Sequence, residues 1–450
     1  MSGAAGTLHD RLAASGLDAA EIAGRVALIE RARAAFEQDH GRAPLWGWLV
    51  PGRIEVFGKH TDYAGGRSLV AAVPRGFAVV AGPRDDGRVT AHDARWDARM
   101  DVNPADDPRA FTGWANYVAV VARRLARNFP GAPLGIDIAF ASDLPRAAGL
   151  SSSSALVVGV ASAIARRARL GDRPEWRAAL PTLLDVAGYL GAVENGLTYG
   201  ALASTSGVGT HGGSEDHTAI LACRANHMSA FSYVPVRPAG ERALPEAWRF
   251  VVMASGIEAD KAGSANGRYN RASLATQALV SLWRRTTGAP ARTLAAILAE
   301  PGAADALSEL AGREGEGDFT PADLSRRLAH FRAEDARVPL ALAAFERADA
   351  DAIAAIAGAS QIHAGSLLEN QIPETVALAR MAREEGAFAA SSFGAGFGGS
   401  VWALAGASDA DAFAGRWRAA YLGATPAVRD VASFVARPAP GAIDLRLTES

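Results

Sequence analysis

Hydrophobic and polar residues follow a helical spacing at the start of the chain and a strand-like spacing afterwards. Residues 9–40 are rich in Ala, Leu, Ile, Glu and Arg with few breaking residues, which predicts a helix. From residue 46 the apolar segments shorten, and residues 46–58, 68–73 and 76–81 predict strands separated by Gly and Pro. The first part of the chain therefore predicts a helix followed by a sheet.

Helices and strands then alternate without the regular strand–helix–strand repeat of a parallel sheet. The predicted elements are helix 112–128, strand 136–141, an apolar helix ending at 167, helix 176–195, strand 249–254, helices within 273–385 and strand 400–405. This mixture predicts an α+β fold. A Pro-, Gly- and Glu-rich segment from Pro238 to Glu246 is the best boundary, so we predict two domains, residues 1–237 and 238–450.

Composition and charge narrow the class of protein. The 450 residues are 49% hydrophobic, and 46 Lys and Arg against 48 Asp and Glu give a net charge of −2, which argues against a general nucleic-acid binder. The single cysteine, Cys223, excludes an intramolecular disulfide framework. The first residues show no signal pattern, and the longest apolar run, Ala155 to Ala165, is shorter than the roughly 20 residues of a membrane span. We therefore expect a cytoplasmic protein without a membrane partner, as a monomer or dimer.

Four serines, Ser151 to Ser154, follow Gly149-Leu150 and precede the apolar helix. The amino terminus of a helix binds phosphate readily, and a serine hydroxyl can supply an oxygen to Mg²⁺. The alternative is that one serine caps the helix and the others form a solvated turn. The number of serines favours phosphate binding, and because the chain has no Walker A sequence, a nucleotide would be held without a P-loop.

A second polar segment follows the first predicted strand, where Lys59, His60, Thr61, Asp62 and Tyr63 lead into Gly65-Gly66. An ionised Asp accepts two hydrogen bonds, which suits a pair of neighbouring sugar hydroxyls, and a His can donate or accept. The alternative is a polar hairpin tip in which the Asp bonds its own backbone. This segment alone leaves both interpretations open.

Acidic residues gather in a third segment, Gly212-Gly-Ser-Glu-Asp-His. Asp216 is a candidate general base toward a hydroxyl, and Glu194, at the end of the preceding helix, is a candidate Mg²⁺ ligand. Metal binding by His217 has no supporting spacing. A position on the surface of a loop is expected for Glu215 more than for Asp216.

A glycine-rich segment, Gly394-Ala-Gly-Phe-Gly-Gly, formally satisfies the dinucleotide-binding pattern G-x-G-x-x-G. That pattern requires a helix after the glycines, whereas Ser400 to Ala405 predicts a strand. We therefore reject a dinucleotide site and expect a glycine turn that allows close approach of the backbone.

Taken together, these segments resemble the GHMP kinases, and the galactokinase branch in particular. Gly52-Arg-Ile-Glu-Val-Phe-Gly-Lys-His-Thr-Asp-Tyr-Ala-Gly-Gly resembles the galactokinase signature G-R-V-N-L-I-G-E-H-T-D-Y-N-G-G. The serine segment resembles the phosphate motif P-x-G-x-G-L-S-S-S-A, and residues 391–400 resemble the third, glycine-rich motif. Trp114-Ala-Asn-Tyr-Val also matches a galactokinase stretch. The matches occur in family order from about residue 45 to 405.

The resemblance implies a two-domain GHMP kinase fold with the active site between the domains, and Mg²⁺-dependent transfer of phosphate from ATP to the anomeric (C1) hydroxyl of a galactose-like sugar. It implies the following roles: Asp216 and Arg53 in catalysis, Lys59, His60, Asp62 and Tyr269 at the sugar, Trp114, Gly149, Leu150, Ser151, Ser152, Ser153 and Ser154 at ATP, and Ser153 and Glu194 at Mg²⁺.

The departures from the signature concern the sugar. Lys59 replaces the glutamate that reads the C6 hydroxyl in galactokinases, which exchanges an acceptor for a cationic donor and suggests an acidic sugar such as a hexuronate. The alternative is that Lys59 turns away to pair with Glu55, itself a replacement of the signature asparagine. Ala147 replaces a glycine of the phosphate motif, and the segments 197–211 and 265–268 are longer than in galactokinases. Lys261 is the only other lysine of the chain.

Two other functions compete with a sugar-1-kinase. A GHMP kinase for a non-sugar alcohol is disfavoured by His60-Thr61-Asp62. A non-catalytic sensor of sugar and ATP is disfavoured by Asp216, Arg53 and Glu194, although Ala147 is compatible with it.

Overall fold

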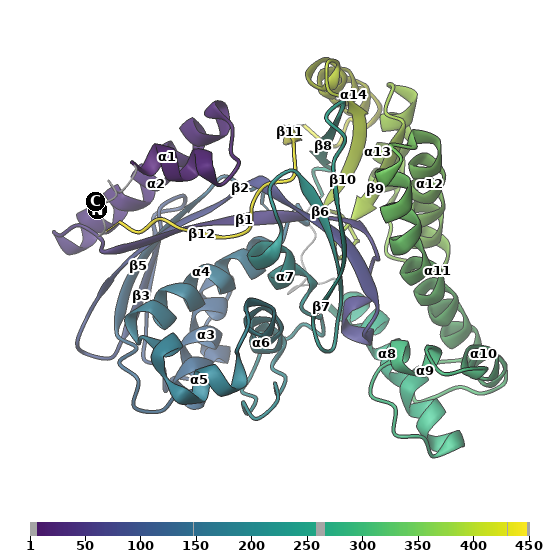
Figure 1. Cartoon of the computed structure of the whole chain (residues 1–450), viewed down its shortest axis with the longest axis horizontal. Coiled ribbons are helices and arrows are strands. Elements are labelled where there is room, and N and C mark those ends of the chain that lie inside the picture. The colour runs from purple at the N-terminus through teal and green to yellow at the C-terminus, as the bar shows by residue number, and fades with distance from the viewer. Residues whose placement is uncertain (1–6, 147, 258–265, 430, 448–450) are drawn as a thin grey trace, which may run out of the picture.

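The structure of the chain is a computed structural model that describes residues 7–146, 148–257, 266–429 and 431–447. Two β-sheets and the helices around them make up the fold (Figure 1). The α+β class expected from the sequence is confirmed. The glycine segment at 394–399 is followed by a strand, as predicted, rather than by a helix.

The larger sheet has the strand order β12-β1-β2-β5-β3-β4, and β6 and β7 continue it from β2. Its pairs are antiparallel except β3 with β5. The predicted strands 68–73 and 76–81 form one long strand, because both pair with β1, on either side of a register shift between Pro51 and Arg53. The strands are β1 (Trp46–Phe57), β2 (Arg67–Pro83), β3 (Val89–Asp93), β4 (Ala98–Val102), β5 (Ile136–Ser142), β6 (His227–Ser232), β7 (Arg237–Ala243) and β12 (Ile443–Asp444).

Helices cover both faces of this sheet (Figure 1). On one face lie α1 (Leu8–Ala14) and α2 (Ala19–His40), predicted as one helix but separated at Gly16, whose φ of +96° ends the first helix. On the other side, α4 (Ser152–Arg167) and α7 (Glu215–Ala222) contact the strands, and α3 (Trp114–Asn128) and α6 (Leu183–Asn195) pack on α4. The short helix α5 (Pro174–Ala179) follows α4 in the chain. Because helices cover β1 from both sides, the side chains on both faces of this strand are buried.

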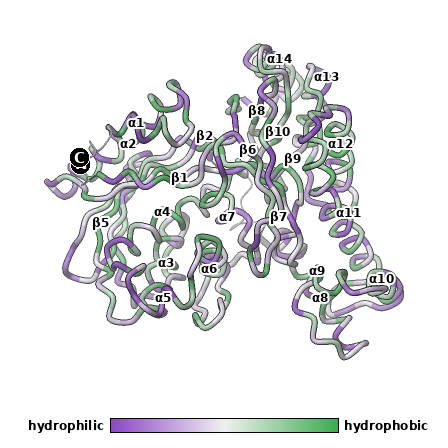
Figure 2. The backbone as a smooth tube through the Cα atoms, viewed as in Figure 1, coloured by the Kyte–Doolittle hydropathy of each residue, from purple (hydrophilic) through white to green (hydrophobic). Residues whose placement is uncertain are grey.

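The smaller sheet is antiparallel, in the order β11-β8-β10-β9. Its strands are β8 (Trp248–Ala254), β9 (Ala389–Phe393), β10 (Ser400–Gly406) and β11 (Ser433–Ala436). Around it and beyond it lie α8 (Asn266–Thr287), α9 (Leu294–Leu298), α10 (Ala303–Arg313), α11 (Pro321–Glu346), α12 (Ala350–Ser366), α13 (Pro373–Glu384) and α14 (Ala410–Ala424). In Figure 2, α11 and α12 alternate between hydrophobic and hydrophilic colours, as expected of helices with one buried face.

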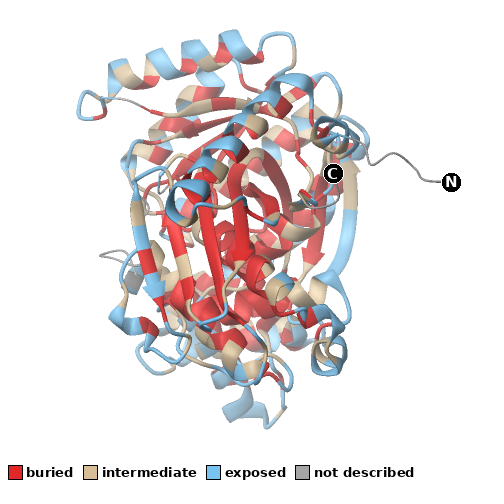
Figure 3. Cartoon of the chain, turned by 90° about the vertical axis from the view of Figure 1, so that its left-hand side faces the viewer, coloured by how far each residue is buried: buried red, intermediate tan, exposed pale blue. Residues whose placement is uncertain are grey.

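One continuous hydrophobic core joins the two sheets. Phe57 at the end of β1 meets Trp402 of β10 edge to face, with ring centroids 5.7 Å apart, and Phe250 of β8 packs on the same indole. The central strands of the large sheet, β1, β2 and β5, are almost entirely buried (Figure 3). Because this core crosses between the sheets, the end of β1 is held rigidly beside the smaller sheet.

The chain crosses between the two parts more than once. β7, which follows residue 237, pairs with β6 in the larger sheet, and β12 returns from the carboxyl-terminal end to pair with β1. The division into domains 1–237 and 238–450 stays a prediction. Within the described ranges, no helix is both long and apolar enough to cross a membrane.

Candidate active site

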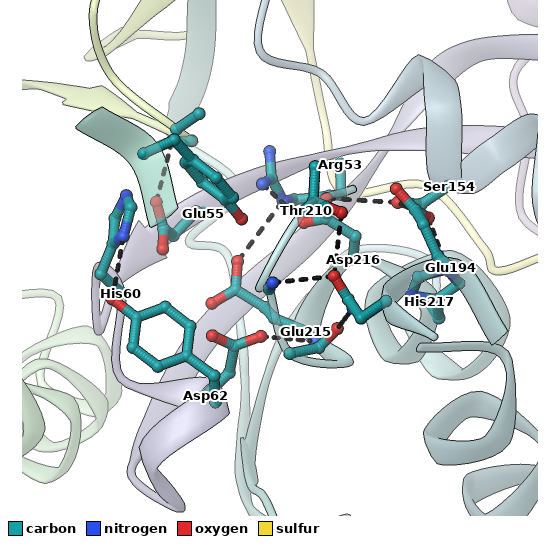
Figure 4. Close-up of a pocket in the computed structure, with 17 residues that line it drawn as sticks. Arg53, Glu55, His60, Asp62, Ser154, Glu194, Thr210, Glu215, Asp216 and His217 are labelled. Carbon is teal, nitrogen blue, oxygen red and sulfur yellow. Dashed lines mark hydrogen bonds and ion pairs between the residues drawn. The ribbon is translucent and has the colours of Figure 1, made fainter. Parts of the chain in front are cut away.

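A polar pocket lies where β1, the turn after it, the loop before α7 and the first turns of α4 and α8 meet (Figure 4). Segments far apart in the sequence therefore contribute to one site. Its lining residues are Arg53, Glu55, His60, Asp62, Tyr63, Ser154, Glu194, Asn195, Thr210, Gly212, Gly213, Glu215, Asp216, His217, Tyr269, Gly394 and Ala395.

The turn after β1 presents His60 and Asp62 to this pocket. Gly58, with φ +94°, begins the turn, and a Cβ there would collide with the backbone of Ser68. Thr61 Oγ1 donates to the carbonyl oxygens of Gly58 and Arg67, at 2.8 and 2.7 Å, and so closes the turn from within. Asp62 Oδ2 accepts from the backbone N–H of Glu215 at 3.1 Å, which ties the turn to α7.

Arg53 and Asp216 form the charged centre of the pocket. Arg53 Nη2 lies 2.6 Å from Asp216 Oδ1, and Nη1 donates to the carbonyl oxygen of Gly149 at 2.6 Å. Burial by itself would lower the pKa of Arg53, but Asp216, Glu215 and Glu55 raise it above its ordinary value, so this side chain stays a cation. The arginine thereby joins the acidic segment of α7 to the serine loop.

Glu215 is buried, contrary to the position on the surface of a loop that the sequence suggested. It is 4% exposed, and Oε1 lies 3.4 Å from Arg53 Nε. The segment looked like a solvated loop because its neighbours are Gly and Ser, but it begins a helix packed against the sheet. Burial, followed by Glu55 and the nearby aspartates, raises the pKa of Glu215 well above its ordinary value, whereas Arg53 acts in the opposite direction.

The serine loop passes along another side of the pocket. Ser151 occupies the position before α4 in a left-handed conformation, φ +62°, and its side chain makes no capping hydrogen bond. The capping alternative therefore has no support at this serine. Ser154 Oγ donates to Glu194 Oε2 at 2.9 Å and lies 3.4 Å from Asp216 Oδ2. The structure thus brings Ser154, rather than Ser153, to Glu194.

Glu194 also meets His217 Nε2, at 2.9 Å. Among the described residues, no group of three or more His, Cys, Asp or Glu side chains is arranged to hold a metal ion by itself. Any metal at Glu194 would therefore need further ligands from a bound substrate.

Lys59 points away from the pocket. Its Nζ donates to Ser391 Oγ of β9 at 2.6 Å, the residue is 1% exposed, and it is not among the pocket-lining residues. Burial lowers the pKa of Lys59, whereas Glu334 and Glu55 act in the opposite direction. The sequence suggested that Lys59 either contacts an anionic substrate group or pairs with Glu55. Neither expectation fully describes its hydrogen bond to Ser391.

Tyr269 and Trp114 have different positions relative to the pocket. Tyr269 of α8 lines it and packs on the ring of His60, with centroids 5.5 Å apart. Trp114 begins α3 and packs edge to face on Phe140 of the large sheet, outside the set of lining residues. Ala147 and Lys261 lie outside the described residues.

Sequence reasoning missed two residues that shape the pocket. Asn195 Oδ1 accepts from Thr210 Oγ1 at 2.9 Å and from the N–H of Gly212 at 2.8 Å, so this amide holds the loop before α7 in place. Polar residues at a helix end and in a Gly/Ser/Thr-rich loop are common, and no spacing marked these two. The longer segment 197–211 lines a neighbouring cavity of about 800 Å³, which shares Asp62 and Gly213 with the pocket.

Three family models match the chain in order. They are the galactokinase galactose-binding signature at residues 34–83, the GHMP kinase N-terminal domain at 116–196 and the GHMP kinase C-terminal domain at 341–422. The first contains β1 and the turn with His60 and Asp62, and the second contains the serine loop and Glu194.

Similar proteins are galactokinases. That of Streptomyces coelicolor is 28% identical over 84% of this chain and 89% of its own length, and that of Chloroflexus aurantiacus is 29% identical over the same shares. Among solved structures, Lactococcus lactis galactokinase complexed with galactose superposes with a TM-score of 0.72, at 22% identity, over 92% of this chain and 99% of that one. Methanococcus jannaschii mevalonate kinase superposes with a TM-score of 0.52, at 13% identity, over 88% of this chain and 98% of that one. The ordered matches, the fold and the grouped motifs agree: the chain is similar to the GHMP kinases along most of its length, and it is a galactokinase-like, ATP-dependent sugar kinase.

Proposed function

We propose that this kinase transfers the γ-phosphate of ATP to the anomeric (C1) hydroxyl of a galactose-like monosaccharide. The contact between Arg53 Nη2 and Asp216 Oδ1, at 2.6 Å, carries the proposal. Asp216 lines the same pocket as His60 and Asp62 of the sugar-reading turn and Ser154 after the serine loop, which supports a role as the base. An acceptor hydroxyl and a phosphate donor can therefore meet at Asp216.

Asp216 acts as the base toward the attacking hydroxyl. Arg53 stabilises its negative charge, so the carboxylate is ready to accept the proton as the hydroxyl oxygen attacks the γ-phosphorus in line. Phosphoryl transfer depends mainly on positioning and on neutralising charge. Asp62 accepts hydrogen bonds from sugar hydroxyls, and Tyr269, which packs on His60, lines the same pocket.

The serine loop and the amino terminus of α4 hold the phosphates of ATP. The unpaired N–H groups of the first turn and the partial positive charge of the helix end favour an anion there. Ser151 Oγ, buried and without a hydrogen-bond partner, is available to donate to a phosphate oxygen. Trp114 packs on the sheet, apart from the pocket, as a candidate contact of the adenine.

Mg²⁺ fits the oxygen donors of Glu194 and Ser154. These two atoms lie 2.9 Å apart, and Mg²⁺ is commonly held by one or two carboxylates together with substrate phosphates. When bound, the ion would neutralise charge on the transferred phosphate. His217 Nε2 lies 2.9 Å from the same carboxylate.

An acidic acceptor has no support from the structure. The hexuronate interpretation depended on Lys59, whose ammonium group donates to Ser391 rather than into the pocket. The identity of the acceptor therefore depends on the residues that line the pocket.

Release of ADP in a coupled assay over a panel of free sugars tests the proposal, and proton-coupled ³¹P NMR of the product identifies the phosphorylated carbon. Asp216→Asn should lower kcat by about a thousandfold or more, because the base is lost while ATP binding is kept. Asp305→Asn, which makes the same change at an exposed residue of α10, is the matched control. Binding of ATP and sugar without turnover in the unmodified protein would contradict catalysis and favour a sensor. A phosphate ester at another carbon would contradict the C1 assignment.

A further inference from the structure

The pocket carries more negative than positive side chains. Among the described residues that line it, five are carboxylates and Arg53 is the only arginine or lysine. The carboxylates are Glu55, Asp62, Glu194, Glu215 and Asp216. An excess of this size in a buried site must be compensated by bound protons, by metal ions or by the substrate.

Four of these carboxylates have partners within the protein. Arg53 meets Asp216, and Ser154 and His217 meet Glu194. Glu55 Oε2 accepts from the N–H of Gly394 at 2.8 Å, and Asp62 accepts from the N–H of Glu215. These contacts leave Glu215 as the least satisfied acid of the group.

Glu215 reaches the pocket with one oxygen unpaired. Oε1 lies 3.4 Å from Arg53 Nε, a long contact with a guanidinium group that also binds Asp216. Oε2 is buried and has no hydrogen-bond partner. A buried polar atom without a partner is costly, so an unpaired oxygen in a substrate pocket indicates that the ligand supplies the missing donor.

The charge of the site decides which donor fits best. A hydroxyl leaves the negative excess unchanged, and an acidic sugar increases it. A protonated amine donates to Oε2 and also removes one charge, which gives a charge-assisted hydrogen bond. In the free protein, burial and the neighbouring acids raise the pKa of Glu215, which favours a proton on its carboxyl group, and the ammonium group would replace that proton.

We propose that Glu215 binds a protonated amine on the acceptor, so that the preferred substrate is an amino sugar rather than a neutral or acidic one. The inference rests on the proposed sugar-kinase function. Glu215 and Asp216 share Arg53, which places the amine close to the reacting hydroxyl. For transfer to C1, this position corresponds to a 2-amino hexose such as galactosamine.

The first experiment compares kcat/KM for galactosamine, galactose, N-acetylgalactosamine and galacturonate with the unmodified enzyme. We expect galactosamine to exceed galactose by about tenfold or more, because one charge-assisted contact is gained. N-acetylgalactosamine should lose the preference because its nitrogen carries no charge, and galacturonate should be the poorest of the four. Equal or better use of galactose would overturn the amine assignment and leave the kinase function standing. Failure of all sugars to react would instead contradict the proposed function itself.

The second experiment uses Glu215→Gln, with Glu300→Gln, an exposed residue that follows α9, as the matched control. Glu215→Gln should reduce the ratio of kcat/KM for galactosamine over galactose to about one, whereas the control keeps the ratio of the unmodified enzyme. An unchanged ratio in Glu215→Gln would contradict the proposal.

Binding calorimetry in two buffers of different ionisation enthalpy gives a readout without turnover. Galactosamine should displace the proton of Glu215, so the unmodified protein releases more protons with galactosamine than with galactose. The difference should vanish in Glu215→Gln. Equal proton release for both sugars in the unmodified protein would overturn the proposal even if the variant failed to fold.

Discussion

Lys59 belongs to the same turn as His60, and its side chain is buried, with the ammonium group removed from solvent. Burial lowers its pKa to about 8, although Glu334 and Glu55 act in the opposite direction. The side chain donates to Ser391, across the junction between the two sheets. At this position a lysine therefore compensates buried acids, a role that the residue type alone did not reveal.

Lys59→Glu, which restores the residue of the galactokinase signature, should destabilise the protein rather than change its sugar preference. The new carboxylate would be buried beside Glu55 and Glu334, and an uncompensated buried charge costs about 3–5 kcal/mol. Urea unfolding measures this loss. Adding Glu55→Asn should recover part of it by removing one like charge. A stable Lys59→Glu variant with a new preference for neutral sugars would contradict this account.

The pH dependence of stability offers a second check on Lys59. The unfolded chain keeps the ordinary lysine pKa of 10.5, whereas the folded value is about 8. Between these values the unfolded state binds a proton that the folded state has lost, so the contribution of Lys59 to the free energy of unfolding rises with pH. Below about pH 8 both states are protonated and this slope disappears.

Lys59→Met should remove that contribution. Urea unfolding from pH 7 to 10 should show the free energy of the unmodified protein rising relative to that of Lys59→Met above about pH 8. Parallel curves for the two proteins over the whole pH range would contradict the burial of the Lys59 ammonium group.

At the scale of elements, the loop before α7 holds the sugar-reading turn by close backbone packing. Gly213 lies against Asp62 and Tyr63, and a Cβ on Gly213 would lie 2.8 Å from Tyr63 N and closer still to the Asp62 carboxylate. Asn195 secures the same loop from the end of α6. The position of Asp62 therefore depends on two elements that follow it by more than a hundred residues.

Gly213→Ala should raise KM for the sugar by about tenfold or more, because the added methyl group displaces Asp62 from its contact with the N–H of Glu215. The affinity for ATP should change much less. Gly365→Ala is the matched control, since a Cβ there meets no atom within 4 Å in the exposed part of α12. That substitution should leave kinetics unchanged and stabilise the helix by about 0.5–1 kcal/mol. Equal KM values for Gly213→Ala and the control would contradict the role of the loop.

At the scale of the whole molecule, α11 connects the sugar-reading turn to the carboxyl-terminal half. Glu334, fully buried in this helix, accepts from the N–H of Gly58 at 3.2 Å and from Arg337 and Ser360. Arg327 of the same helix donates to the carbonyl oxygen of His60. The turn is thus fixed by contacts that lie more than 260 residues away in sequence.

A fragment ending at residue 237 should not fold cooperatively. It lacks β7 and β12, which leaves the edges of β6 and β1 unpaired, and it lacks α11 beneath the turn. Circular dichroism during urea titration should show no cooperative transition for the fragment and a clear one for the full chain. A cooperative transition in the fragment would show that this half is an independent domain.

Sequence patterns anticipated much of this architecture. Strand spacing, glycine turns and the apolar helix after the serines predicted the α+β class, and the resemblance named the family before any contact was known. The patterns joined α1 to α2 and divided β2, because local spacing does not report a turn at Gly16 or pairing along a neighbouring strand. Arg53, Asp62 and Asp216 were singled out by residue type and motif, and they line one pocket.

Residue types, their order and the chemistry that they allow were determined by the sequence itself, because hydrogen-bonding capacity, charge and hydrophobic spacing are local properties. Only the tertiary structure decided the direction of Lys59, the burial of Glu215 and the choice of Ser154 over Ser153 beside Glu194. Each of these depends on neighbours supplied by distant segments. Burial and pairing set the charge and hydrogen bonding of such groups, and no local pattern contains that information.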